Sequence, residues 1–428
     1  MNPLMEHFYN QKKQNINMET TESTYAQKTF LNDEFWEFVR LHQNEDPARL
    51  RLSAHTFRDV TFDISAAILQ IDARKRFAKK LSQTLALFPK FYFPDLLAGE
   101  QSTGDAAACY HINFIPEKTS LVDMTAGLGI DLTHLARKAS SAVGVERREH
   151  MAEILRWNAA GLGLSNVEVL EGDSVELLDT LPKADTVFID PARRASDGSR
   201  VFGLSDCEPD VTSLLPSLKE KYNRLVIKAS PMLDIAQTIK DLRGTTNIYI
   251  LGTPTECKEL DAIVDLNPDA DVEPRIHAVT LNNDGKPVEF TFTRAEEAEA
   301  PVPKTKTPEK GHFLYVPAPA VMKAAPIKLL AEKFGVDKLA NNTHLYTSTC
   351  KREFPGETLE ITEVIQWQSK NIKRLKTRYP QISVSTRNFG MSADALRSKL
   401  GVKDGGNERL FGVTTADDKR LLLVCRPA

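Results

Sequence analysis

Apolar residues in the first part of the chain recur with the spacing of amphipathic helices. Two sets of positions show this spacing: Phe35, Phe38, Val39 and His42, then Ile64, Ile68, Ile71 and Leu81. A third helix is expected to start after an N-cap at Ser102 or Thr103, because a side-chain oxygen there accepts from free amides of the first turn. We therefore predict a helical domain over residues 29–116, after a polar, flexible leader over residues 1–28.

From Ser120 onward, short aliphatic runs alternate with helical segments. The runs cover residues 121–124, 142–146, 167–170, 186–190, 224–229 and 247–251. This alternation is typical of a doubly wound parallel sheet, so residues 117–294 are expected to form a Rossmann-like α/β domain. Two further runs, 275–281 and 288–293, flank an Asn-Asp-Gly-Lys turn at 283–286 and predict a hairpin.

A change in composition marks the next boundary. Residues 295–310 (AEEAEAPVPKTKTPEK) are rich in Pro, Lys and Glu and predict a linker. Beyond it, strand-like and helical pieces alternate up to Cys425, which predicts a C-terminal α+β domain over residues 311–428. The length of 428 residues agrees with this division, since domains average roughly 150 residues.

Composition narrows the class of protein. The formal net charge is −3, so any site for a polyanion has to be a local patch. The cysteines lie far apart with no C-x-x-C pair, which argues against structural zinc or a disulfide framework, and we expect no metal. Neither a signal peptide nor an apolar stretch of ~20 residues is present, so we expect a cytoplasmic protein without membrane association. No obligate protein partner is inferred.

The segment LVDMTAGLGID at 121–131 carries the strongest chemical signal. A buried strand ends at Asp123, a turn with Gly127 and Gly129 follows, and a helix begins near Ile130. Glycines let a ligand approach the backbone, and the helix N-terminus favours a carboxylate or phosphate. A nicotinamide-binding G-x-G-x-x-G would need a third glycine where Leu132 stands. An acid four residues before the first glycine fits a methyltransferase better, because it can accept from the ammonium group of the cofactor.

Acidic residues after the next two strands extend this site. Glu146 ends the second strand, 23 residues after Asp123, where a carboxylate can bind both ribose hydroxyls. Asp173 follows the third strand in EGDS, where class I methyltransferases hold the adenine amino group. Residues 101–103 are expected near the methionine carboxylate. The predicted cofactor-binding residues are Gln101, Thr103, Asp123, Thr125, Gly127, Gly129, Asp131, Glu146 and Asp173.

Plainer roles are open for several of these residues. Glu146 and Asp173 could be solvated acids at strand ends, and the two glycines could form an ordinary tight turn. Asp131 could serve only as a helix cap, and so could residues 101–103.

Several motifs together resemble those of a known family. They are GEQSTGDAAA (99–108), DMTAGLGID, VGVE, EGD, DPARR, TECKE (255–259) and RNFGMSADALRSKLGVKDGG near the end. With them the chain resembles a Bacteroidetes-type family that joins a class I methyltransferase domain to a ferredoxin-like segment and a C-terminal THUMP-like domain. The resemblance implies S-adenosylmethionine as cofactor and RNA as partner.

The fourth strand runs into FIDPARR at 188–194, where class I enzymes place the substrate. Asp190, Pro191 and Arg193 are therefore candidate catalytic residues. Enzymes that methylate exocyclic base nitrogens carry D/N-P-P-Y/F here, and the aromatic stacks on the flipped base. Arg193 stands in place of the aromatic and could stack on a base or hold a phosphate.

Lys228, at the end of the fifth strand, opens another possibility. With Asp190 and the segment 256–259 it resembles the Lys-Asp-Lys-Glu set of ribose 2′-O-methyltransferases, in which a lysine takes the hydroxyl proton. No clear counterpart of the first lysine occurs near residues 100–110, and Lys228 could simply snorkel at a strand end. Methylation at C5 would need a thiolate, and Cys207 has no flanking signature of a nucleophile.

Two basic stretches are candidates for RNA contact. Residues 74–80 (RKRFAKK) favour a solvated helix face over a phosphate site. Residues 366–400 contain eight cations and one acid, Asp394. The aromatic residues Trp367, Tyr379 and Phe389 occur in the same stretch. The cations are Lys370, Lys373, Arg374, Lys376, Arg378, Arg387, Arg397 and Lys399.

The sequence thus predicts an S-adenosylmethionine-dependent methyltransferase that modifies a nucleotide of tRNA or rRNA. A base amine is favoured and a ribose 2′-hydroxyl stays open. The alternatives are a methyltransferase of protein or a small molecule, and a binding protein without turnover.

Overall fold

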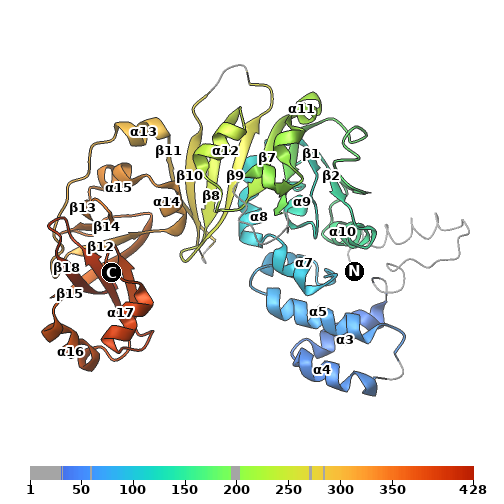
Figure 1. Cartoon of the computed structure of the whole chain (residues 1–428). Coiled ribbons are helices and arrows are strands. Elements are labelled where there is room, and N and C mark those ends of the chain that lie inside the picture. The colour runs from blue at the N-terminus through green and yellow to red at the C-terminus, as the bar shows by residue number, and fades with distance from the viewer. Residues whose placement is uncertain (1–29, 31, 58–59, 194–202, 269–271, 283–284) are drawn as a thin grey trace, which may run out of the picture. The chain divides into compact units, whose positions relative to one another are not determined.

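The computed structural model of the chain describes residues 30, 32–57, 60–193, 203–268, 272–282 and 285–428 (Figure 1). The side chains of Arg193 and Lys373 are outside this description, as are the predicted leader, Arg194 and the first two residues of the hairpin turn. Two compact units share the described residues. The first takes in Met1–Ala229, Ala236–Thr245 and Ala262–Asp271, and the second Ser230–Ile235, Thr246–Asp261 and Val272–Ala428.

Helices make up the N-terminal part of the first unit. They are α3 (Asp33–His42), α4 (Pro47–Ser53), α5 (Ile64–Phe77), α6 (Ser82–Leu87), α7 (Leu96–Gln101) and α8 (Asp105–His111), with the 3-10 turns η1 (Ala54–Thr56) and η2 (Ile112–Phe114). Capping side chains explain two of the starts, because Asn32 accepts from the amide of Phe35 and Asp63 from that of Ser65. Their apolar faces bury a core rich in aromatic rings, including Phe35 and Tyr92.

The two helices expected from the spacing are α3 and α5, and Leu81 lies beyond the end of α5. The third prediction was wrong in its start. Helix α8 begins at Asp105 after Gly104, because the hydroxyl of Thr103 donates to Asp131 instead of capping the helix.

A parallel sheet forms the rest of the first unit and confirms the predicted α/β fold. Its strands are β1 (Ser120–Asp123), β2 (Ser141–Glu146), β3 (Val167–Glu171), β4 (Ala184–Ile189) and β7 (Tyr222–Ala229). They follow the order β7-β4-β1-β2-β3, and each neighbouring pair is parallel. The order reverses beside β1, so the carboxyl ends of β1 and β4 lie together, where open α/β sheets bind ligands.

Helical segments alternate with these strands, as the periodicity predicted. They are α9 (Ile130–Leu135), α10 (Glu149–Gly161), α11 (Val211–Lys221) and α12 (Ile235–Asp241). After β4 the chain forms a small antiparallel pair from β5 (Ala192–Arg193) and β6 (Cys207–Glu208), with η3 (Leu204–Asp206) between them.

The second unit contains the predicted hairpin. Strand β10 (Arg275–Leu281) pairs antiparallel with β11 (Pro287–Phe292) and parallel with β8 (Thr245–Gly252). Strand β9 (Cys257–Asp265) is not among the predicted runs, and Lys258 and Glu259 lie within it. Its polar positions interrupt the aliphatic run that marks the other strands.

A seven-stranded sheet forms the predicted C-terminal α+β domain, in the order β13-β14-β12-β15-β18-β17-β16. The strands are β12 (Phe313–Pro317), β13 (Asp337–Ala340), β14 (Thr343–Ser348), β15 (Gly356–Gln366), β16 (Ser383–Arg387), β17 (Arg409–Thr414) and β18 (Arg420–Pro427). The helices of this unit are α13 (Arg294–Glu299), α14 (Pro319–Ala324), α15 (Ile327–Phe334), α16 (Ser369–Arg378) and α17 (Ala393–Leu400).

Strand β18 shows why this domain holds together. Its side chains alternate between two cores, with Leu421 and Leu423 in one and Leu422 and Val424 in the other. The second core also contains leucines of α16 and α17, so these helices cover one face of the sheet.

The segment predicted as a linker, residues 295–310, includes most of α13 and a bridge from Thr305 to Lys338. Within the described ranges, no helix has the length and apolar character needed to cross a membrane.

Candidate active site

The turn after β1 has a backbone that only glycine adopts easily. Gly127 and Gly129 have φ angles of 52° and 84°, and Gly129 is the N-cap of α9. A Cβ atom at Gly129 would lie 2.1 Å from Cδ1 of Leu155 on α10. The glycine is therefore required both by the left-handed turn and by the close packing of α10.

Asp123 lies at the base of this turn, where its side chain is almost completely buried. Its Oδ1 accepts from the amide of Thr125 at 2.9 Å. Burial raises the pKa of Asp123 to about 7, and the carboxylates of Asp131 and Asp190 add to the effect of burial. Such a carboxyl group loses its proton readily when a cation binds beside it.

Thr125 joins the ends of two strands. Its Oγ1 accepts from the amide of Asp190 at 2.7 Å, and the amide of Met124 donates to the carbonyl of Phe188 at 3.0 Å. The predicted substrate motif after β4 is thereby fixed against the predicted cofactor turn after β1.

The acids predicted to hold the ribose and the adenine follow β2 and β3. Glu146 Oε1 accepts from the amide and Nε of Arg148, at 3.0 and 3.2 Å. The amide of Gly172 donates to the carbonyl of Glu146 at 3.0 Å, and Asp173 accepts from Val175 at 2.8 Å. The carboxyl ends of parallel strands lie at the same edge of a sheet, so Glu146 and Asp173 lie at the same edge as Asp123.

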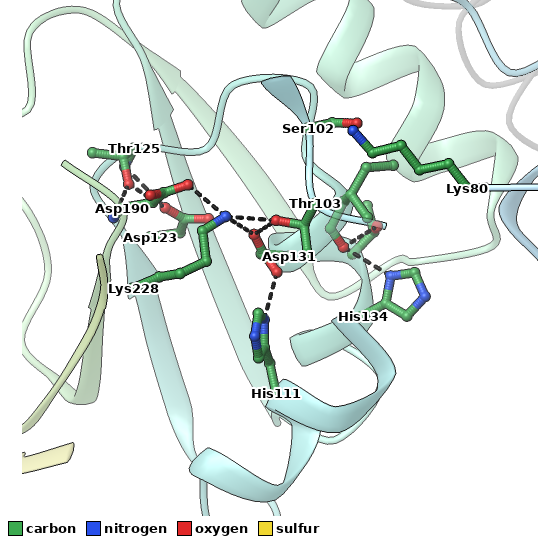
Figure 2. A network of polar contacts seen from close by, with 12 residues as sticks. Lys80, Ser102, Thr103, His111, Asp123, Thr125, Asp131, His134, Asp190 and Lys228 are labelled. Carbon is green, nitrogen blue, oxygen red and sulfur yellow. Dashed lines mark hydrogen bonds and ion pairs between the residues drawn. The ribbon is translucent and has the colours of Figure 1, made fainter. Parts of the chain in front are cut away.

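A network of charged groups lies next to this turn (Figure 2). The ammonium group of Lys228 is 2.5 Å from Asp190 Oδ2, 3.0 Å from Asp131 Oδ2 and 2.6 Å from Thr103 Oγ1. Asp131 Oδ1 also contacts Nδ1 of the fully buried His111 at 2.8 Å. Burial alone would raise the pKa of Asp131, but Lys228 and His111 outweigh it and hold this pKa well below its usual range.

The structure thus brings six of the predicted residues into one cluster: Thr103, Asp123, Thr125, Asp131, Asp190 and Lys228 (Figure 2). Gln101 is exposed at the end of α7, and Pro191 is buried beside Asp190. Arg193 lies in β5, and its side chain is outside the description. Sequence reasoning missed His111, whose position in α8 carries no motif.

These residues fit S-adenosylmethionine by their chemistry. The cofactor carries an ammonium group and a positive sulfur, which suit the neighbouring carboxylates of Asp123 and Asp190. Its ribose diol suits a carboxylate at a strand end such as Glu146. The glycine turn leaves the backbone open to a close ligand.

The basic run at 74–80 has a structural role in the first unit. Arg74 donates to the carbonyls of Pro89 and Phe91, at 2.8 and 2.6 Å. Lys80 donates to two carbonyls of α7, and Arg76 pairs with Asp72 at 2.9 Å. Arg74 and Lys80 hold backbone segments together, which differs from the solvated helix face that the sequence favoured.

The second basic stretch forms a surface on the second unit. We use the name α16 surface for the exposed cations Lys370, Arg374 and Lys376, together with Arg378. Arg378 pairs with Glu363 at 2.7 Å, and a groove of about 490 Å³ lies beside it. The groove is lined by Glu363, Ile365, Asn371, Arg374, Leu375, Thr377 and Arg378.

The aromatic residues near this surface differ in how far their rings are open to stacking on a nucleobase. Phe389 is 2% exposed and belongs to the core, with Trp367 packed edge-on against it. Lys399 lies over the Trp367 ring at 5.1 Å, and the Tyr379 hydroxyl donates to Glu363. Stacking on a nucleobase is therefore excluded at Phe389 and restricted at the other two rings.

Fold and sequence motifs define the first unit as a class I methyltransferase domain, whose cofactor is S-adenosylmethionine. Residues 313–355 match a ferredoxin-like domain, and residues 356–427 match the THUMP domain-like family. The crystal structure of a protein from Porphyromonas gingivalis W83, assigned as a methyltransferase, is 34% identical with a TM-score of 0.82. The match covers 92% of this chain and 98% of that one. This chain therefore belongs to the same methyltransferase family, which confirms the resemblance found in the sequence.

A curated relative is similar over a shorter stretch. Over 149 residues the chain is 34% identical to 23S rRNA (uracil(1939)-C(5))-methyltransferase RlmD of Idiomarina loihiensis. The match takes in 33% of this chain and only 30% of the length of that enzyme.

Proposed function

We propose that this protein transfers a methyl group from S-adenosylmethionine to an exocyclic base amine in tRNA or rRNA. The observation that carries the proposal is the position of Asp190. It follows β4 in an Asp-Pro motif, is tied through Thr125 to the glycine turn, and has a side chain that is 37% exposed. A carboxylate in this position can accept from the N–H of a target amine.

In this proposal, Asp123 binds the ammonium group of the cofactor, and the left-handed turn at Gly127 and Gly129 brings the backbone close to its methionine part. Glu146 binds the ribose hydroxyls and Asp173 the adenine amino group. When bound, S-adenosylmethionine supplies a methyl group that its positive sulfur already activates.

Residues after β4 act on the acceptor. The Asp190 carboxylate orients the amine by accepting one N–H. The nitrogen that gains the methyl group loses this strongly acidic proton to solvent water by way of the carboxylate. Pro191 keeps the backbone of the motif extended at the target. Most of the rate enhancement then comes from alignment, because the methyl group needs no further activation.

The second unit supports RNA as the polymer that accepts the methyl group. A THUMP-like domain there carries the α16 surface, whose cations suit a phosphate backbone. The named target of the curated relative is also an RNA, although the match spans less than a third of that enzyme. A location in the cytoplasm, where tRNA and rRNA act, is part of this proposal.

The name of the relative favours a second candidate, methylation of C5 of uracil. That reaction needs a reactive thiolate, which forms where the pKa of a cysteine is lowered. Burial raises the pKa of Cys257 to about 11 and also raises those of Cys109 and Cys425. Cys207 is buried, with its thiol 3.8 Å from the carbonyl of Gly203. These four cysteines are poor nucleophiles, and the exposed Cys350 lies in the second unit, which carries none of the cofactor motifs, so the amine is the better candidate.

The test is transfer of labelled methyl groups into fractionated tRNA, rRNA and total protein from a strain that lacks the gene. Fractions from the parent strain and the Asp190→Ala enzyme are the controls. We expect label in one RNA fraction, absent with parental RNA, and reduced about a thousandfold by Asp190→Ala.

Nucleoside mass spectrometry of the labelled RNA then separates the candidates. A methylated base amine supports the proposal, whereas 5-methyluridine or a 2′-O-methyl nucleoside contradicts the choice of atom. Label in protein alone, or in no fraction although the cofactor binds, contradicts the proposal as a whole.

A further inference from the structure

Lys228 is held by groups from several separate segments of the first unit. Its ammonium group contacts Asp190 after β4, Asp131 at the start of α9 and Thr103 between α7 and α8 (Figure 2). The side chain is only 11% exposed, as is that of Asp131. Asp190, with 37% of its side chain exposed, is the member of this network that is most open to solvent.

The direction of the hydrogen bonds shows which form of the lysine the site accepts. Thr103 Oγ1 donates its hydrogen to Asp131 Oδ2 and accepts from Lys228. Lys228 therefore faces three acceptors, two of them carboxylate oxygens, within 3.0 Å. A charged ammonium group has three hydrogens for these acceptors, whereas a neutral amine has two and would point a lone pair at an oxygen.

This arrangement opposes the role of Lys228 as a base. A general base has to be neutral before it takes a proton, and adjacent carboxylates favour the charged lysine. To act like the lysine that takes the hydroxyl proton in ribose 2′-O-methyltransferases, Lys228 would have to be neutral. It would then lose its two close ion pairs, with Asp131 and Asp190. The same contacts are suited to hold the carboxylate of Asp190 in one orientation and in its ionised form.

Thr103 and Asp131 were predicted to bind the cofactor, but their polar atoms contact Lys228 and its neighbours. The hydroxyl of Thr103 is engaged by Asp131 and Lys228, and both oxygens of Asp131 are engaged, Oδ2 by Thr103 and Lys228 and Oδ1 by His111. Their polar atoms point into the network.

We infer that Thr103 and Asp131 hold the ammonium group of Lys228, and that Lys228 in turn positions the Asp190 carboxylate for the acceptor. Thr103, Asp131 and Lys228 are then positioning residues, and neither Thr103 nor Asp131 binds the cofactor. The N-terminal segment before α8 thereby contributes to methyl transfer without touching either substrate. The inference rests on the proposed function for its kinetic part only.

The test compares Thr103→Val, which keeps the shape but removes the hydroxyl, with Thr103→Ser, which keeps the hydroxyl. Isothermal titration gives the dissociation constant for S-adenosylmethionine, and methyl transfer to the identified RNA gives kcat and KM. We expect Thr103→Val to lower kcat about tenfold and to leave cofactor affinity within about twofold, with most of the loss restored in Thr103→Ser. A matching loss of cofactor affinity in Thr103→Val would overturn the inference.

A double-mutant cycle tests whether Thr103 acts through Lys228. Lys228→Met should lower kcat about a hundredfold, and adding Thr103→Val should cost no more than about a further twofold. Two losses that multiply would show independent roles and overturn the inference. If Lys228→Met does not fold, the Thr103→Val and Thr103→Ser pair decides the question alone.

The binding measurement separates this inference from the proposed function. If no RNA is methylated by the wild-type protein, the proposed function fails. Cofactor affinity of Thr103→Val still decides whether Thr103 is a cofactor ligand, which the inference denies.

Discussion

Charged side chains gather in two regions of this protein, and the two regions treat charge differently. Near the turn after β1, Asp123, Asp131 and Lys228 are buried and lie within hydrogen-bond distance of partners. On the α16 surface, Lys370, Arg374 and Lys376 are exposed and form no ion pair with any residue that the structure describes. In the proposed function, the first region recognises the cofactor by geometry and the second attracts RNA by charge.

The physical reason is the surrounding medium. Charges interact strongly where water is excluded, so each buried group depends on the exact position of its partners. Exposed charges are screened by salt, so their attraction for a polyanion depends on their number more than on their exact positions. The predictions below test this difference, from the largest expected effect to the smallest.

Asp123→Asn should weaken binding of S-adenosylmethionine roughly a hundredfold, because it removes the carboxylate that we propose binds the ammonium group of the cofactor. RNA affinity should not change. Isothermal titration with each ligand measures both. The matched control is Glu220→Gln, which removes an exposed acid of α11 and should leave both affinities unchanged. An Asp123→Asn protein with wild-type cofactor affinity would contradict the assignment of the cofactor site.

Changing Lys370, Arg374 and Lys376 together to alanine should weaken RNA binding roughly tenfold at low salt. The slope of log K against the logarithm of the salt concentration should become shallower by about two. Cofactor affinity should stay the same. Fluorescence anisotropy at several salt concentrations measures the effect. The control changes three exposed lysines of the first unit to alanine and so removes the same total charge. They are Lys79, Lys183 and Lys219. Equal losses in the two proteins would show that net charge, and not the α16 surface, controls RNA affinity.

Cofactor affinity should rise with pH through about 7, the pKa of Asp123. Below that pH the carboxyl group is protonated and lacks the charge that attracts an ammonium group, and above it the charge is present. Between about pH 6 and about pH 7 affinity should rise about fivefold, before the amine of the cofactor, whose pKa is about 7.7–8.0, loses much of its proton. Titrations at these two values measure the change, and Asp123→Asn should abolish it. A flat profile in the wild type would contradict the prediction.

The smallest effect is expected for Arg397→Ala in α17. Arg397 pairs with Asp394 at 2.6 Å, but the side chain of Asp394 is 81% exposed. Exposed pairs contribute little, so the free energy of unfolding should fall by less than about 0.5 kcal/mol. Urea denaturation of the purified protein measures it. A loss above about 1 kcal/mol would show that charges near the α16 surface have a structural role.

Much of the cofactor site could be predicted from the chain because its parts are local. The strand that ends at Asp123, the glycines of the turn and the start of α9 lie within eleven residues, and spacing alone relates them. The hairpin of β10 and β11 was predictable for the same reason. The start of α8 was not, because the hydroxyl that could have capped it is used by a residue 28 positions away.

The sequence by itself determined the alternation of strands and helices, the acids and glycines at the strand ends, and the family to which the chain belongs. Only the tertiary structure decided which groups Lys228 contacts. Its partners Asp131 and Thr103 are 97 and 125 residues away in the chain, so no spacing relates them. Folding of the sheet and of the N-terminal helices brings these groups together in a buried place, and burial turns an ordinary strand-end lysine into part of an ordered network.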